Sequence, residues 1–531
     1  MEQLIITGNV RNCTYTIYAV MLAATLVAHA AELFKKDMAN FKLRLKSFWL
    51  VLALFTMAFA VSGKFALVFL AFINYLALKE FFSLIPARRA DRRVLLWAYL
   101  AIPIQFYFIY INWIVMFYLF IPLYMFLLIP VRMVLIGENE GFLKSCGTIH
   151  WGLMATVYSL GYLAMYLLVP LESNPSGGAV GMLLCLLVLT VFNDFSQFFF
   201  GKLLGKKRII PKVSPNKTWE GFIGGVVATA ALASVLTPYL TPLSHAQGVL
   251  AGLGIGVTGF LGDVTMSAIK RDIGVKDTAH FCPGTAGYWT GSTALCSRRP
   301  CFSTSPFTFT PCWANKMKSI LKYLFFLLCV KPFIHVVFGI NVKNPQNLPR
   351  NGPAILVANH NSHIDTLVLM CLFTTPQLLK VNPVAAMDYF FNTGFRSFLF
   401  KTLLGAIAIK RHKRMFSRED IFAEINQNLK EGHTLIIYPE GTRSMDSEIQ
   451  EFKTGVAHLA KSNPEVPVVP IFINGPDRIM PKYDSLPVPF ICDVHIGAPM
   501  HIEGDTKRQF TERVYREVLK LKQTHYEGRN S

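Results

Sequence analysis

The stretch Ala354-Ile-Leu-Val-Ala-Asn-His-Asn-Ser-His-Ile-Asp365 passes from an apolar segment directly into polar residues. Its apolar part, Ala354–Ala358, has the length and character of a buried strand. Comparable apolar runs, Thr434–Tyr438 and Val466–Ile473, alternate with amphipathic stretches such as Arg418–Leu429. This alternation predicts an α/β domain in the C-terminal part of the chain.

Two polar residues after the first strand suit acid–base chemistry. His360 follows the strand end, and Asp365 comes about one helical turn later, at the start of the helix-like run Thr366–Phe373. A histidine held in one tautomer by a carboxylate can act as a general base. The plainer alternatives are a hydrogen-bonded loop histidine and, for Asp365, the N-cap of the next helix.

A second strand-like run ends in Pro439-Glu440-Gly441-Thr442-Arg443-Ser444. Backbone amides beside a glycine, together with an arginine, suit the binding of a phosphate monoester. Lys453 adds a cation, and so does Arg411, which follows the strand-like run Ala406–Ile409. Each of these charges, taken alone, could equally be an exposed loop residue.

The motifs Asn-His-x-Ser-His-x-Asp and Pro-Glu-Gly-Thr-Arg-Ser together resemble the 1-acyl-sn-glycerol-3-phosphate acyltransferase family, and Pro470 fits a further block of that family. The resemblance implies a membrane-associated acyltransferase domain over residues 317–531. It implies that His360 deprotonates the 2-hydroxyl of lysophosphatidate, that Asp365 orients His360, and that the product is phosphatidate.

The same resemblance implies how the substrates are held. The residues that position the glycerol phosphate would be Glu440, Gly441 and Arg443, assisted by Arg411 and Lys453. The acyl donor would be a thioester of CoA or of acyl carrier protein, and this chemistry needs no metal. Tyr438 stands where the family commonly has Phe, and we expect this departure to have no effect.

The composition of the whole chain is that of a membrane protein. It has 531 residues, of which 53% are hydrophobic and 16% charged, against roughly 25% charged in soluble domains. The mean hydropathy is +0.40. These values exclude a disordered chain and an ordinary soluble enzyme. Lys and Arg exceed Asp and Glu by 52 to 32, which suits cytoplasmic loops and anionic lipid rather than nucleic acid. The 10 cysteines lack paired spacing, so neither disulfides nor zinc are indicated.

The N-terminal part contains about nine apolar runs long enough to cross a bilayer. They are 15–34, 47–62, 64–84, 94–111, 113–132, 150–171, 178–200, 222–240 and 247–266. Basic clusters follow the first, third and seventh runs, whereas Glu172–Gly178 lacks Lys and Arg. The positive-inside rule then places the N-terminus outside and both catalytic regions in the cytoplasm.

We therefore predict a multi-pass α-helical domain in the cell (inner) membrane, followed by a cytoplasmic α/β acyltransferase domain. The apolar stretch Met317–Ile340 is interrupted by Lys331-Pro332. This interruption predicts an interfacial or re-entrant helical pair rather than a span.

Charged residues gather where the last predicted spans meet the cytoplasm. Asn193-Asp194 ends one span, Ser214-Pro-Asn-Lys-Thr-Trp-Glu220 lies in the following loop, and Gly262-Asp263 precedes Ser267–Asp277. Acidic residues can hold Mg²⁺, and basic residues can hold the phosphates of a nucleotide and a lipid. The alternative is that these are solvated loops that only set the topology.

These residues resemble the signature of phosphatidate cytidylyltransferases (CDP-diacylglycerol synthases), which begins S-x-x-K-R-x4-K-D. The resemblance implies that Asp263 and Asp277 are ligands of Mg²⁺ and that CTP and phosphatidate are the substrates. The other residues it implicates are Asp194, Ser214, Asn216, Lys217, Ser267, Lys270, Arg271 and Lys276.

The second half of this signature, P-G-H-G-G followed by D-R-x-D, is missing after Pro283-Gly284. The sequence Thr285–Ala294 that stands there can be encoded so that an overlapping frame reads His-Gly-Gly-Leu-Leu-Asp-Arg-Leu-Asp-Ser. One missing G after Pro283 would produce the change. The stretch Cys296–Pro311, rich in Ser, Thr, Cys and Pro, has the texture of an out-of-frame translation.

The sequence thus predicts three regions: a cytidylyltransferase-like membrane domain (1–284), an out-of-frame linker (285–316) and an acyltransferase domain (317–531). The predicted function is phospholipid biosynthesis by acyl transfer to 1-acylglycerol-3-phosphate, with an attached, impaired cytidylyltransferase. One alternative is a bifunctional enzyme that also makes CDP-diacylglycerol. A non-catalytic membrane scaffold or transporter is the other, although the inverted repeats typical of transporters are not evident.

Overall fold

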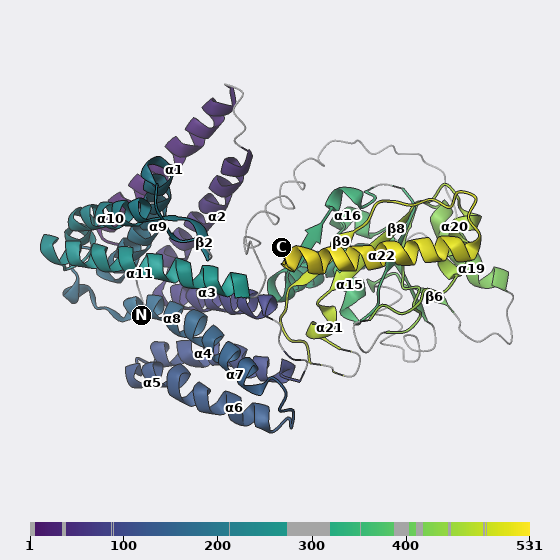
Figure 1. Cartoon of the computed structure of the whole chain (residues 1–531), viewed down its shortest axis with the longest axis horizontal. Helices are drawn as coiled ribbons and strands as arrows, with labels where there is room; N and C mark the ends of the chain where they lie inside the picture. The colour runs from purple at the N-terminus through teal and green to yellow at the C-terminus, as the bar shows by residue number, and fades with distance from the viewer. Residues whose placement is uncertain are drawn as a thin grey trace, which may run out of the picture. The chain divides into compact units, whose positions relative to one another are not determined.

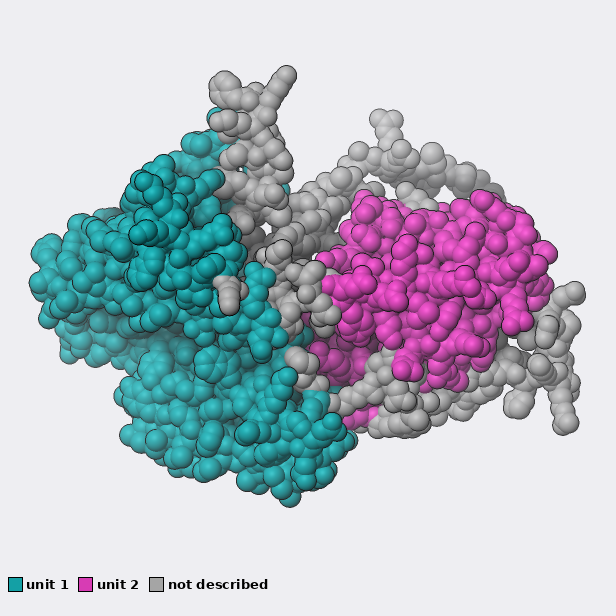
Figure 2. Space-filling model, in the orientation of Figure 1, with its two compact units in different colours: residues 1–289, 531 teal, residues 290–530 magenta. Residues whose placement is uncertain are grey.

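The structure is a computed structural model of the whole chain (Figure 1). It describes residues 6–33, 39–85, 88, 90–211, 213–272, 319–350, 352–386, 403–409, 418–443, 448–481, 484 and 486–530. The chain forms two compact units, residues 1–289 with 531 and residues 290–530 (Figure 2). The predicted linker 285–316 lies outside the described residues.

The first unit is built almost entirely of helices. In chain order they are α1 (Gly8–Leu33), α2 (Ala39–Val61), α3 (Gly63–Leu84), α4 (Arg92–Tyr110), α5 (Ile114–Leu119), η1 (Phe120–Met125), α6 (Phe126–Val134), α7 (Phe142–Gly152), η2 (Leu153–Tyr158), α8 (Ser159–Met165), η3 (Tyr166–Leu168), η4 (Leu171–Ser173), α9 (Gly178–Leu204), α10 (Trp219–Leu240) and α11 (His245–Asp272). A short antiparallel hairpin, β1 (Arg208–Ile210) and β2 (Ser214–Thr218), joins α9 to α10.

The described residues contain 9 helices that are long and apolar enough to cross a membrane. One of these is Ser319–Phe338, and the others overlap eight of the predicted spans. The remaining predicted span, 47–62, falls in α2, where only Phe48–Val61 is apolar, because charged residues occupy the start of that helix. The prediction of a multi-pass helical domain is confirmed.

Contacts at the helix ends agree with the predicted alternation of spans. At one end, the Thr7 hydroxyl donates to the Ser176 carbonyl over 2.9 Å, and the Asn9 amide donates to the Tyr239 carbonyl over 2.9 Å. At the other end, the Arg88 guanidinium donates to the Glu138 carbonyl over 3.2 Å. Segments predicted to lie on the same side of the membrane therefore contact each other.

The second unit is an α/β domain, as predicted. Its helices and strands are η5 (Phe326–Val330), α14 (Lys331–Phe333), η6 (Ile334–Phe338), β3 (Ile340–Lys343), η7 (Pro345–Asn347), β4 (Ala354–Ala358), α15 (Ile364–Cys371), α16 (Thr375–Leu378), β5 (Val381–Ala386), β6 (Ile407–Ile409), α19 (Arg418–Lys430), β7 (Thr434–Ile437), α20 (Gly455–Ser462), β8 (Val468–Asn474), α21 (Pro476–Ile479), β9 (Cys492–Ile496) and α22 (Lys507–Asn530).

A seven-stranded sheet of order β3-β9-β8-β4-β7-β5-β6 forms the centre of this unit. Strand β4 is parallel to both neighbours, β7 and β8, and all five of its residues are buried. Strand β9 runs antiparallel to β8. Because parallel central strands end at one edge of a sheet, the loops after β4 and β7 meet there, which brings the two acyltransferase-like motifs together.

The helix expected to break at Lys331-Pro332 does not break: Ser319–Phe338 is one continuous helix. Its turns on both sides of α14 are π-helical. Such wider turns allow the helix to continue past a proline, which has no N–H to donate to the preceding turn. The prediction of a helical pair is therefore wrong.

Candidate active sites

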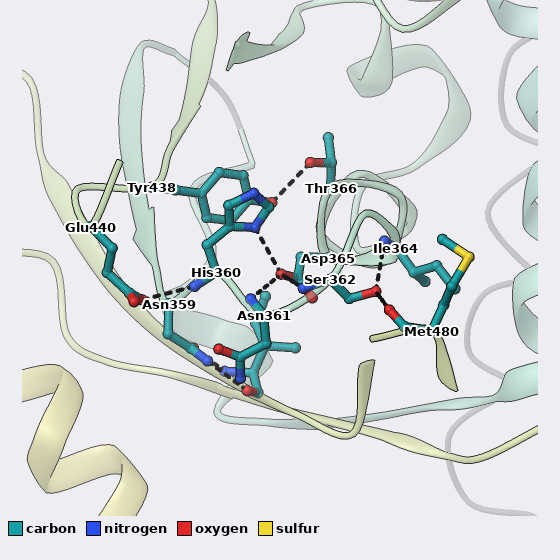
Figure 3. A network of polar contacts seen from close by, with 11 residues as sticks. Asn359, His360, Asn361, Ser362, Ile364, Asp365, Thr366, Tyr438, Glu440 and Met480 are labelled. Carbon is teal, nitrogen blue, oxygen red and sulfur yellow. Dashed lines mark hydrogen bonds and ion pairs between the residues drawn. The ribbon is translucent and has the colours of Figure 1, made fainter. Parts of the chain in front are cut away.

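The chain leaving β4 is anchored by Asn359, the first residue of the histidine motif. Its side chain mimics a backbone pairing with Ile473: Nδ2 donates to the Ile473 carbonyl over 2.9 Å, and the Ile473 amide donates to Oδ1 over 2.8 Å. Farther along the loop, the Ser362 hydroxyl donates to the Met480 carbonyl over 2.6 Å. These bonds fix the loop that carries His360 against β8 and the segment after it (Figure 3).

His360 and Asp365 form the pair that the sequence predicts. His360 Nδ1 lies 2.9 Å from Asp365 Oδ2, and Asp365 is 1% exposed. The same oxygen accepts the backbone amides of Asn361 and Ser362 over 2.7 and 2.8 Å (Figure 3). A carboxylate held in this way keeps the proton of neutral His360 on Nδ1, which leaves Nε2 as the proton acceptor. Asp365 therefore orients the histidine and also accepts hydrogen bonds from two backbone amides of the loop that carries His360.

Tyr438, directly after β7, lies flat against His360. The two ring centroids are 4.1 Å apart, with 18° between the ring planes. The Tyr438 hydroxyl lies 3.0 Å from the Thr366 hydroxyl on α15 (Figure 3). Sequence reasoning assigned no role to either residue, because a stack between two different loops appears only once the sheet is assembled.

Glu440 braces the two motifs against each other. Oε1 accepts the His360 backbone amide over 2.9 Å, and Oε2 accepts the Gln450 amide over 3.3 Å. The residue is 2% exposed, and burial raises the pKa of Glu440 to about 7. Both carboxylate oxygens thus accept hydrogen bonds from the protein backbone and connect the two loops. The role that the resemblance implies for Glu440, positioning the glycerol phosphate, stays a prediction.

Glu440 should make acyl transfer sensitive to pH. Protonation of the Glu440 carboxylate places a hydrogen on one of its two oxygens, each of which faces a backbone N–H. As pH falls through about 7, one of these two N–H groups therefore loses its acceptor. Glu440→Gln mimics that state at every pH and should lower the rate about tenfold above pH 8, as expected for a buried donor left unsatisfied. The ratio of wild-type to Glu440→Gln rates should therefore fall toward one in acid.

Taking this ratio cancels any pH dependence that both proteins share. The matched control is Glu448→Gln, which alters an exposed carboxylate of the same segment. Its rate relative to wild type should stay constant between pH 5.5 and 8.5. A wild-type to Glu440→Gln ratio that does not change with pH would contradict the assigned role.

The Lys453 ammonium group lies beside Gly441, whose φ is +74°. A Cβ at this position would lie 2.6 Å from Lys453 Nζ, so the glycine makes room for the ammonium group. Arg443 and His360 both act electrostatically on His363, and with burial as the largest cause they lower the pKa of His363 to about 4. His363 is therefore neutral near pH 7. Arg411 lies outside the described residues.

In the first unit, α9, α10 and α11 pack closely because glycines line their contacts. A Cβ on Gly225 would lie 2.3 Å from Gln197 Cγ, and one on Gly252 would lie 2.6 Å from Ala230 Cα. Small residues of this kind let membrane helices approach closely. This packing brings the cytidylyltransferase-like residues of three segments to one end of the helices.

Three charged residues of that signature meet there. Lys217, on β2, forms an ion pair with Asp263 on α11. Asp194, on α9, interacts electrostatically with both of them. The Ser267 hydroxyl donates to the Asp263 carbonyl over 2.8 Å. The structure thus brings together predicted site residues that are far apart in sequence.

The remaining residues of this signature are placed less completely. Ser214 and Asn216 lie on β2, and Arg271 lies exposed in the last turn of α11. The Lys270 side chain and all of Lys276 and Asp277 lie outside the described residues. Sequence reasoning assigned no role to Glu220, whose carboxylate accepts the Lys206 amide over 3.0 Å and so fixes the start of the loop.

Within the part of the chain that the structure describes, no three His, Cys, Asp or Glu side chains are placed to hold a metal ion. Asp194 and Asp263 form a pair of neighbouring carboxylates. Mg²⁺ is commonly held by one or two carboxylates together with substrate phosphates. The two aspartates therefore fit such an ion.

Comparison with known proteins identifies the family to which the first unit belongs. The curated protein YnbB of Escherichia coli (strain K12), an uncharacterized protein, is 39% identical over 289 residues, which are 54% of this chain and 95% of YnbB. The cytidylyltransferase family model matches residues 42–288. The chain belongs to the cytidylyltransferase family. This family match stops before the described part of the second unit begins.

Other relatives of this cytidylyltransferase-family chain bear an enzymatic name. The phosphatidate cytidylyltransferase of Mycobacterium leprae is 33% identical over 134 residues, 25% of this chain and 43% of the relative. That of Bacillus subtilis is 43% identical over 96 residues, 18% of this chain and 35% of the relative. The matched stretches thus span less than half the length of these two relatives.

The second unit carries an acyltransferase domain, since the acyltransferase family model matches residues 339–474. The solved 1-acyl-sn-glycerophosphate (LPA) acyltransferase PlsC from Thermotoga maritima is 20% identical, with a TM-score of 0.31, and the match covers 40% of this chain and 97% of that one. The cytidylyltransferase-family chain is therefore a membrane protein with an attached acyltransferase domain, as the sequence predicts.

Proposed function

We propose that the second unit transfers an acyl group from a thioester to the 2-hydroxyl of 1-acylglycerol-3-phosphate and so makes phosphatidate. The observation that carries the proposal is the 2.9 Å contact between His360 Nδ1 and Asp365 Oδ2, with cationic side chains beside it. An imidazole oriented in this way needs no protein nucleophile, because the substrate supplies the attacking hydroxyl.

In the proposed reaction, His360 Nε2 takes the proton of the 2-hydroxyl while that oxygen attacks the thioester carbonyl carbon. The tetrahedral intermediate collapses, a C–O ester bond remains, and the C–S bond breaks. The imidazolium then returns its proton to the leaving thiolate. Asp365 stabilises the imidazolium, as in other histidine bases paired with a carboxylate. Every step uses side chains of this chain, and the reaction requires no metal.

The phosphate of the acceptor would bind between Arg443 and the Lys453 ammonium beside Gly441. Both are cationic side chain types, and Arg443 offers paired donors that match phosphate oxygens. Because His363 is neutral there, the positive charge in this region comes from the arginine and the lysine. Arg411, assigned a role by resemblance, would assist.

Membranes that contain the chain should convert 1-acylglycerol-3-phosphate and an acyl thioester to phosphatidate. Supplying acyl-CoA and acyl carrier protein thioesters in parallel identifies the donor. Glycerol-3-phosphate, which lacks the 1-acyl chain, is the control acceptor. The proposal fails if the lysophosphatidate acceptor yields no phosphatidate with either donor.

Arg443→Ala should raise the KM for lysophosphatidate about 10- to 100-fold and leave kcat nearly unchanged, because a charge-assisted hydrogen bond to the phosphate is lost in the ground state and the transition state alike. Initial rates over a range of acceptor concentrations measure both constants. The control is Arg516→Ala, which removes an exposed arginine that forms an ion pair with its helical neighbour Glu512. A loss confined to kcat would contradict phosphate binding by Arg443.

For the first unit we propose a cytidylyltransferase-like site that is impaired. Asp194 and Asp263 would hold Mg²⁺, which neutralises negative charge on nucleotide phosphates. Lys217, Lys270 and Arg271 would bind phosphate oxygens. The missing His-Gly-Gly and Asp-Arg-x-Asp segments would leave CTP and phosphatidate without their remaining contacts. A bifunctional enzyme, in which the altered segment still works, is the second candidate.

We propose that the helix Ser319–Phe338 lies along the membrane surface. Lys322 Nζ donates to the Val381 carbonyl over 2.8 Å, and Lys331 Nζ donates to the Phe373 carbonyl over 2.7 Å. The helix is thus bound along its length to the α/β domain, whereas a span needs lipid around it. Its other face is apolar, with Leu328 67% and Ile320 54% exposed, which suits the interface.

Both catalytic regions should face the cytoplasm of the inner membrane. In a cysteine-free background, Ser176→Cys should react with an impermeant thiol reagent from outside. Lys206→Cys should react only after permeabilisation, because the basic loop after α9 is retained inside. The reverse labelling pattern would contradict the proposed orientation.

A further inference from the structure

We propose that Tyr438 and Thr366 form a positioning pair that fixes the plane of the His360 imidazole for proton transfer. The inference rests on the proposed acyl transfer, since it assigns a role within the same site. The resemblance gives neither Tyr438 nor Thr366 a role. The proposal also replaces the expectation that tyrosine instead of phenylalanine at position 438 has no effect, because the Tyr438 hydroxyl contacts Thr366.

The pair contacts the histidine from a second direction. Asp365 holds one atom of the imidazole, Nδ1, at 2.9 Å. Tyr438 covers a face of the ring, with the centroids 4.1 Å apart and only 18° between the planes. A hydrogen bond to a single ring atom still allows the imidazole to tilt about that atom. A near-parallel neighbour removes the tilt, so that the two contacts together determine where Nε2 points.

The Tyr438 ring is itself held in place by its hydroxyl. Oη lies 3.0 Å from Thr366 Oγ1, and Thr366 follows Asp365 on α15 (Figure 3). The end of β7 is thereby tied to the helix that carries the orienting carboxylate. Burial raises the pKa of Tyr438 well above its usual value of 10, so the phenol stays neutral and keeps its hydrogen bond.

The stack also favours the charge that appears during the reaction. When His360 accepts the proton of the 2-hydroxyl, it becomes a cation over the face of an aromatic ring, an arrangement that is attractive. Before the transfer the imidazole is neutral, so this contribution arises only as the transition state forms. Interactions of this kind raise kcat rather than lower KM.

Four variants separate the ring from its hydroxyl. Tyr438→Leu removes both and should lower kcat by about 10- to 100-fold, the size expected for a misplaced catalytic group, with the KM values for both substrates unchanged. Tyr438→Phe keeps the stack and should lose only about two- to fivefold, as for one hydrogen bond. Thr366→Val should match Tyr438→Phe, and the double variant should be no worse than either, since all three break one bond.

The matched controls are Tyr515→Leu and Tyr515→Phe, at a half-buried tyrosine of the same unit that packs against Phe452 and donates to the Ile449 carbonyl. Both should keep wild-type kcat. Resistance to limited proteolysis in membranes checks that each variant folds. If Tyr438→Leu does not fold, Tyr438→Met, which has a longer and more flexible side chain without a ring, takes its place.

The inference is overturned if the variant without the ring keeps wild-type kcat, or if its loss lies in KM. It is also overturned if Tyr438→Phe and Thr366→Val have additive effects. These results are distinct from failure of the proposed function. In that case the wild-type chain makes no phosphatidate, or His360→Ala remains active.

Discussion

Replacing His360 by alanine is expected to lower phosphatidate formation by ~10²–10⁴-fold, the usual contribution of a general base. No other group of the site can substitute for it. His363 is held near Arg443 with a lowered pKa of about 4, which makes it a weak base, and both Glu440 oxygens accept backbone amides. Initial rates with lysophosphatidate and the acyl thioester in isolated membranes measure the loss.

Asp365→Asn is the companion variant to His360→Ala. An amide in place of the carboxylate would direct either an N–H or a carbonyl oxygen at Nδ1, so the histidine would no longer be fixed in one tautomer. His458→Ala is the control, because this histidine lies on α20 and contacts Lys507 of α22. Substantial activity in His360→Ala would refute the assigned role.

The second large effect should come from repair of the cytidylyltransferase-like signature. Inserting one G into the codons after Pro283, with a stop before Met317, should restore His-Gly-Gly and Asp-Arg-Leu-Asp. We expect CTP-dependent formation of CDP-diacylglycerol to rise at least ~10²-fold, because the loss of a single preorganised polar group at a transition state typically costs ~10²–10³ in rate. Thr285, Trp289 and Thr290, which occupy the altered segment, cannot replace several charged groups.

The comparison needs the repaired and the unrepaired protein in equivalent membranes, with Mg²⁺, CTP and phosphatidate supplied. Asp263→Asn in the repaired chain is the negative control, because it removes one of the two carboxylates proposed to hold the ion. Equal rates in the repaired and unrepaired chains would show that the protein is bifunctional and that the altered segment does not impair it.

Sequence reasoning predicted the parts of the fold that depend on local patterns. Strand β4 has the predicted bounds, and β7, β8 and α19 lie within a few residues of theirs, because apolar periodicity reports burial directly. The long apolar helices followed from length and composition. The helix at Lys331-Pro332 was mispredicted, since the wider turns that accommodate its proline have no simple sequence signal.

Within the acyltransferase site, sequence reasoning found the residues whose chemistry is visible in their type. The contact of His360 with Asp365 is an example, because the two residues are only five positions apart in sequence. The roles of Tyr438 and Glu440 could not be predicted, since each depends on contact with the loop after a neighbouring strand. The sequence does not indicate which residues of another loop an aromatic ring or a buried carboxylate will contact.

The pairing of β3 with β9 has a consequence for synthesis of the chain. Strand β3 lies at the edge of the sheet and, among the described residues, pairs only with β9. The Asn341 side chain donates to Asp493 across 152 positions of sequence. While the ribosome translates the segment between them, β3 has no neighbour, and closing so long a loop is slow. The β3 edge of the sheet can therefore be completed only after β9 has been synthesised.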